Sequence, residues 1–66
     1  MTLASHLERD RLEARAARLD RVIAALRARA RAYDAMAVPR PLRHSLSDFQ
    51  QQLDAVRERL AEASRE

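Results

Sequence analysis

The chain has 66 residues, 47% of them apolar, no glycine, no cysteine, two prolines and a net charge of +3. A chain this short forms at most one domain and has no spare mass for an enzyme cleft. The lack of cysteine excludes disulfides and thiolate metal sites, and abundant Ala and Arg without glycine favour continuous helix. We therefore predict a single all-α domain over residues 1–66 that is not an enzyme and uses no cofactor or metal.

The hydropathy pattern indicates whether the chain enters a membrane or is secreted. No apolar stretch approaches the roughly 20 residues that a membrane-spanning helix needs, and residues 1–10 lack the apolar run of a secretory signal. We expect a cytoplasmic chain without membrane insertion.

In the first half of the chain, apolar residues recur at alternating intervals of four and three, the repeat of one narrow seam along a helix. They are Leu12, Ala16, Leu19, Ile23, Leu26, Ala30, Tyr33 and Ala37. Thr2 and Ser5 are both candidate N-caps, and Ser5 with Glu8 has the spacing of a capping box, so the helix should start between residues 2 and 5. Pro39 disfavours helical backbone at Val38 and cannot donate the next hydrogen bond. We predict a first helix over residues 5–37.

The same alternation resumes after the prolines, at Leu42, Leu46, Phe49, Leu53, Val56, Leu60 and Ala63. Pro41 suits the first turn of a helix, where a missing N–H costs nothing. We predict a second helix over residues 41–64, which makes an antiparallel two-helix hairpin of the coiled-coil type. The segment up to Val38 carries +3 and the segment from Ser45 carries −2, which favours pairing of the two helices.

Counting outward from the turn sets the register of the hairpin. Asp20 has no arginine three or four residues away in its own helix and lies level with Arg57 across the seam, so we predict that these two side chains pair. In this register residues 1 to about 9 extend beyond the second helix, which leaves Leu3 and Leu7 without a partner in the chain.

A partner-facing surface is predicted beside the seam of the first helix. Val22 and Met36 widen this seam to one side, next to a strip of alanines that includes Ala25. Alanine on an exposed face is also an ordinary helix former, but it allows a second helix to approach closely. The predicted partner-binding residues are Leu3, Leu7, Val22, Ala25 and Met36.

Two kinds of charged or ligating residue are candidates for chemical sites. Arg11, Arg15 and Arg18 share one face and could follow a phosphate backbone. No aromatic residues interleave with them and acids interrupt the patch, so nucleic-acid binding is disfavoured. His6 and His44 fall at opposite ends of the predicted hairpin, tens of ångströms apart. They cannot share a metal within one chain, and we expect them to be structural.

The chain resembles the small E-type co-chaperones of type III secretion needle subunits, the YscE/EscE/SsaE kind. The points of likeness are the opening Met1-Thr2-Leu3, the pair Leu7-Glu8, an Ala/Leu/Arg-rich first helix, and Phe49-Gln50-Gln51-Gln52 shortly before Ala55-Val56. The likeness covers most of the chain. Pro39 and Pro41 in the turn, and the polar residues 61–66, depart from what that family leads us to expect.

The resemblance implies a role without catalysis or a small-molecule substrate. In that family the hairpin packs on a second chaperone with a tetratricopeptide-like fold, and the pair holds the needle subunit's C-terminal helix and prevents premature polymerisation. Two alternatives stay open: a self-assembling homodimer that forms a four-helix bundle, and a Rop-like RNA-binding hairpin.

Overall fold

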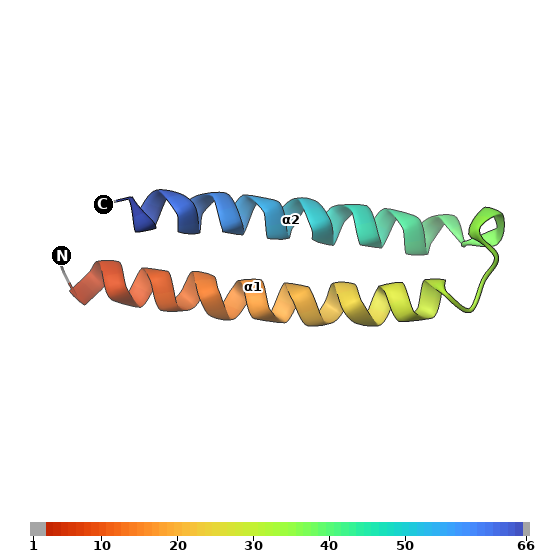
Figure 1. The fold of residues 1–66 in the computed structure, drawn as a ribbon, viewed down its shortest axis with the longest axis horizontal. Helices are drawn as coiled ribbons and strands as arrows, with labels where there is room; N and C mark the ends of the chain where they lie inside the picture. The colour runs from red at the N-terminus through yellow and green to blue at the C-terminus, as the bar shows by residue number, and fades with distance from the viewer. Residues whose placement is uncertain (1–2, 66) are drawn as a thin grey trace.

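The computed structural model describes residues 3–65, with side chains described from residue 6. The chain forms α1 (Leu3–Ala30), a short 3-10 helix η1 (Ala35–Ala37) and α2 (Arg40–Ser64). The two long helices run side by side in opposite directions, and η1 lies in the connection at one end (Figure 1). The predicted all-α antiparallel hairpin is confirmed.

The start of α2 agrees with the prediction to within one residue. Pro39 precedes the helix in extended backbone, with φ −56° and ψ 140°, and Pro41 occupies its first turn. The amides of Leu42 and Arg43 both donate to the carbonyl of Pro39, at 3.1 Å each. Pro41 has no amide hydrogen to leave unpaired there, so the helix begins at no cost in hydrogen bonds.

The last turn of α1 tightens and then stops. The amide of Ala32 donates to the carbonyl of Arg29, and that of Tyr33 to Ala30, both at 3.1 Å and both three residues back instead of four. Asp34 then takes extended backbone, with φ −64° and ψ 149°. The helix therefore ends at Ala30.

The start of α1 at Leu3 falls between Thr2 and Ser5, as predicted, but the predicted helix, residues 5–37, ends about two turns too far along the chain. Pro39 and the residue before it, Val38, are extended, with ψ of 140° and 123°. Two extended residues continue in one direction and cannot reverse the chain. The reversal therefore uses the preceding turn and η1, and Tyr33 and Ala37, predicted for the seam, are exposed.

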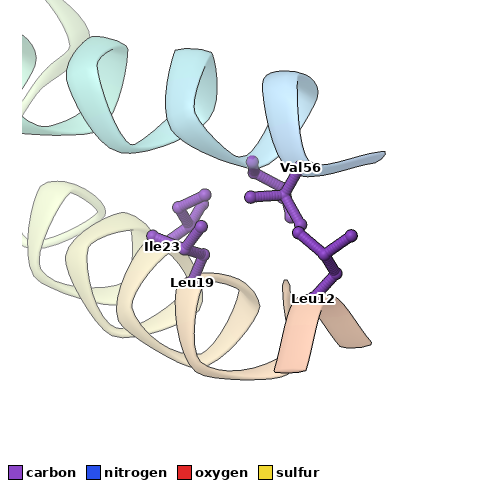
Figure 2. Close-up of a cluster of buried hydrophobic side chains, with 5 residues drawn as sticks. Leu12, Leu19, Ile23 and Val56 are labelled. Carbon is purple, nitrogen blue, oxygen red and sulfur yellow. The ribbon is translucent and has the colours of Figure 1, made fainter. Parts of the chain in front are cut away.

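The core is a single line of side chains between α1 and α2. The buried residues are Leu12, Leu19, Ile23, Leu53 and Val56, and Ala16, Leu46, Phe49 and Leu60 pack against them. Leu12 and Val56 point toward one another across the gap between the helices (Figure 2). Every one of these residues belongs to a predicted seam, so the four-three repeat identified the core correctly.

The molecule is elongated and exposes much of its surface. Its extents are 49 × 15 × 14 Å and its radius of gyration is 15.2 Å, against about 11 Å for a compact chain of this length. The accessible surface is 5360 Å², against roughly 4300 Å² for a compact monomer of the same mass. A hairpin of this shape covers only one face of each helix.

Two side-chain pairs across the seam show which residues of the two helices lie opposite one another. Arg57 Nη2 donates to Asp20 Oδ1 at 3.3 Å, and Arg27 Nη2 donates to Gln50 Oε1 at 3.2 Å. The predicted pairing of Asp20 with Arg57 is confirmed. The register survives the shortening of α1 because the packing of the seams sets it.

At the open end of the hairpin, the contacts between the helices begin earlier in α1 than predicted. Arg9 Nη2 donates to Ser64 Oγ at 3.0 Å, and Arg59 Nη2 donates to Glu8 Oε1 at 3.0 Å. The predicted overhang, residues 1 to about 9, is therefore shorter, because α2 reaches the level of these two α1 residues.

The ion pair between Asp20 and Arg57 is expected to contribute little to stability. Both side chains are more than half exposed, and exposed pairs couple by about 0.2–1 kcal/mol and weaken with salt. A double-mutant cycle of Asp20→Asn and Arg57→Gln, measured by urea unfolding, should give a coupling energy in this range. A cycle of Asp10→Asn with Arg57→Gln is the control. Equal coupling in both cycles would contradict the register.

Candidate protein-binding surface

The structure distributes the predicted partner-binding residues along the length of the hairpin. Leu7, near the open end, is 50% exposed, and Val22, in the middle of α1, is 39% exposed, with Ala25 exposed nearby. Met36 is 99% exposed and lies in η1. Leu3 belongs to α1, but its side chain lies outside the described part of the chain. These residues do not form one contiguous patch.

The predicted continuity between Val22 and Met36 is wrong. It depends on α1 reaching residue 37, which would place the two residues on one line along a single helix. Since α1 ends at Ala30, Met36 lies in η1, after the chain has left that helix. Val22 keeps its place beside the seam, and Met36 belongs to the turn end of the molecule.

A second four-three repeat runs along α1 beside the core seam. Its members, at intervals of four, three, four, three and four, are Arg11, Arg15, Arg18, Val22, Ala25 and Arg29. Residues at these intervals share one side of a helix. We call this side of the hairpin, with Arg59 of α2 that faces it, the arginine flank. Two of the predicted partner-binding residues, Val22 and Ala25, lie on it.

Toward the open end, the arginine flank forms a basic groove of about 620 Å³. The groove is lined by Glu8, Arg11, Leu12, Arg15, Arg18 and Arg59. Four arginines and one glutamate give this lining a net charge of +3, and the glutamate is already paired with Arg59 at 3.0 Å. None of the ion pairs described within residues 6–65 involves Arg11, Arg15 or Arg18.

Toward the turn, the same flank carries a smaller and more apolar hollow of about 260 Å³. It is lined by Leu26, Arg29, Tyr33, Pro39, Pro41, Leu42 and Ser45. Arg29 in this hollow and Arg15 in the basic groove both belong to the second repeat, fourteen residues apart, so the two hollows lie on one side of the hairpin. The arginine flank therefore has a basic end and an apolar end.

The opposite side of the hairpin, the paired flank, has its charges balanced. It carries Arg9, Glu13, Asp20, Arg27, Gln50, Asp54 and Arg57, three cations and three anions. Polar contacts link them along and across the helices: Arg9 to Glu13 at 4.0 Å, Arg57 to Asp20 at 3.3 Å, Arg27 to Gln50 at 3.2 Å and Gln50 to Asp54 at 3.0 Å. The charged side chains of the paired flank therefore contact one another within the chain more extensively than those of the arginine flank.

Part of the arginine flank was not predicted from the sequence. Arg11, Arg15 and Arg18 were singled out there, but Arg29 and Arg59 were not. A detectable signal existed for Arg29, because the second repeat continues through it. Arg59 joins the groove only through the register between the helices.

Other kinds of site receive no support in the described residues. No group of three or more metal-ligating side chains is found in the part of the chain that the structure describes. As far as the helices are described, neither is long and apolar enough to cross a membrane. No family model, curated protein or solved structure matches the chain.

Proposed function

We propose that the chain is a cytoplasmic, non-catalytic protein–protein interaction module. The observation that carries this proposal is the thin core, since only five of the described side chains are buried in a hairpin 49 Å long. A small scaffold with one line of core residues gains stability when a partner covers more of its surface. Such a chain acts by binding a partner protein.

The resemblance makes this proposal more specific. The hairpin is then a needle-subunit co-chaperone, which stabilises a tetratricopeptide-like chaperone and helps to keep the needle protein monomeric. The large exposed apolar side chains are the ones such a partner would cover: Leu7, Val22, Tyr33 and Met36.

Co-expression tests this function directly. The chain is produced together with the tetratricopeptide-like chaperone and the needle subunit of a type III secretion system, and the product is analysed by size-exclusion chromatography with light scattering. We expect a soluble complex of the hairpin and the chaperone that holds the needle subunit monomeric. Elution of the hairpin alone, as a folded monomer, would contradict the co-chaperone function.

Replacing Val22 with aspartate should weaken the chaperone complex at least about tenfold, because the change removes apolar contact and takes a charged carboxylate out of water in the interface. Helicity should be retained, since Val22 is 39% exposed and lies outside the core. Isothermal titration calorimetry gives the affinity, and circular dichroism gives the helicity. Ala28→Asp, on the exposed outer side of α1, controls for the effect of aspartate on the helix. If Met36→Asp breaks the complex and Val22→Asp does not, the interface lies at the turn.

A further inference from the structure

We propose that the arginine flank is the docking site for an acidic amphipathic helix of a partner protein. The acidic end of that helix faces Arg11, Arg15 and Arg18, and its apolar end rests on Tyr33 and Leu42. The inference deepens the proposed function, on which it rests, by naming the surface and the chemistry of the partner.

The charge distribution favours an acidic occupant. The lining of the basic groove has a net charge of +3, which becomes +2 when Glu62, in the adjoining hollow with Glu8 and Arg59, is included. The contacts of the paired flank join equal numbers of cations and anions. Arg11, Arg15 and Arg18 are neighbours along α1 and repel one another, since like charges three or four residues apart destabilise a helix. Carboxylates at matching intervals on a partner helix would relieve this repulsion and form charge-assisted hydrogen bonds.

The shape of the flank favours a helix. From Arg11 to Arg29 the second repeat spans about 27 Å, the length of a helix of about 18 residues. Ala25 allows a helix backbone to approach closely, and Val22, in the middle of the flank, offers apolar contact at 39% exposure. A third helix in this position would pack beside α1 and α2 as in a helical bundle.

A second copy of the chain fits this flank poorly. With the two-fold axis parallel to the helices, the basic groove of one copy would lie on the basic groove of the other, and the arginines would repel. With the axis perpendicular to them, each basic groove would lie on the apolar hollow of the other copy, leaving arginines desolvated without carboxylates. Neither symmetric arrangement is complementary.

A nucleic acid matches only half of the flank. A phosphate backbone carries charge along its whole length, but the end lined by Tyr33, Pro39, Pro41 and Leu42 is largely apolar. No aromatic side chain lines the basic groove to stack on a base. A helix with one acidic end and one apolar end can contact both ends of the flank.

The test uses a capped, fluorescently labelled synthetic helix of 21 residues. The face that docks carries leucines in one half and glutamates in the other, spaced by four and three. Binding to the full-length hairpin is followed by fluorescence anisotropy at several salt concentrations. We expect saturable binding that weakens as salt is raised, and at least about tenfold weaker binding when glutamine replaces every glutamate of the peptide.

Two triple variants of the hairpin locate the site. Arg11→Gln with Arg15→Gln and Arg18→Gln should weaken peptide binding about tenfold, the sum of three exposed ion pairs. The control, Arg21→Gln with Arg40→Gln and Arg43→Gln, removes the same charge from exposed arginines outside the flank, and it should change binding less than twofold. Circular dichroism confirms that both variants fold like the wild type.

Several results would overturn the inference: equal loss in both triple variants, equal binding of the glutamine peptide, displacement of the peptide by a single-stranded RNA at physiological salt, or dimerisation of the hairpin that the first triple variant abolishes. Binding of the chaperone to the same variants shows whether only the docking site is wrong or the proposed function is wrong as well. If the chaperone binds the wild type and both triple variants equally, the co-chaperone function stands and the arginine flank is not its site.

Discussion

Replacing Leu53 with alanine is expected to abolish the weak unfolding transition of the isolated hairpin. Leu53 is the most buried residue described, at 2% exposure, in a core of five buried side chains. A buried Leu→Ala change costs about 2–5 kcal/mol, and the core of so small a scaffold rarely supplies more than about 3–5 kcal/mol in total. The loss would reflect packing alone, because alanine is the best helix former.

Circular dichroism at 222 nm during urea and thermal unfolding measures this effect. Gln51→Ala is the matched control, since Gln51 is an exposed residue of the same helix, and its replacement should leave the transition unchanged or slightly more stable. A Leu53→Ala chain that unfolds with the wild-type midpoint would show that the seam between α1 and α2 does not hold the hairpin together.

Occupation of the arginine flank should raise the thermal midpoint of the hairpin by roughly 10–20 °C. A ligand that binds only the folded state at one hundred times its dissociation constant stabilises that state by about 2.7 kcal/mol, and each kcal/mol shifts the midpoint of a domain this small by about 4–8 °C. The acidic synthetic helix described above is the ligand, and the unfolding of the hairpin is followed by differential scanning calorimetry. The glutamine version of the peptide should give no comparable shift, and equal shifts would argue against charge recognition.

The seams were predictable from the sequence because their signal is periodic and local. Leu12, Leu19 and Ile23 on one helix, and Leu53 and Val56 on the other, follow the four-three repeat and form the buried core. The register was predictable as well. Counting from the turn tolerates a small error, since packing of the seams selects the nearest register that buries both, and the contact between Asp20 and Arg57 agrees with it.

The end of α1 was not predictable from the repeat alone. Tyr33 and Ala37 continue the pattern but lie in the connection, where the geometry imposed by Pro39 requires several residues for the reversal. The apolar pattern carries no information about that requirement. The predicted partner-binding surface contains the same error, because Val22 and Met36 lie on one side of a helix only if that helix is unbroken between them.

The assembled flank depends on tertiary structure. Arg11, Arg15 and Arg18 are visible as one face in the sequence, but the groove also needs Arg59 from the other helix. The contrast between the two sides of the hairpin, one balanced and one basic, needs the contacts across the seam. This contrast makes the arginine flank a candidate site for an acidic helix.

Sedimentation of the isolated wild-type chain, combined with thermal unfolding over a hundredfold range of concentration, tests most directly whether this hairpin depends on a partner. If the thin core is its main source of stability, the chain should melt at a low temperature with weak cooperativity, or should self-associate and melt higher as its concentration is raised. A monomer at every concentration, with a sharp and concentration-independent transition at high temperature, would show that the hairpin does not depend on a partner.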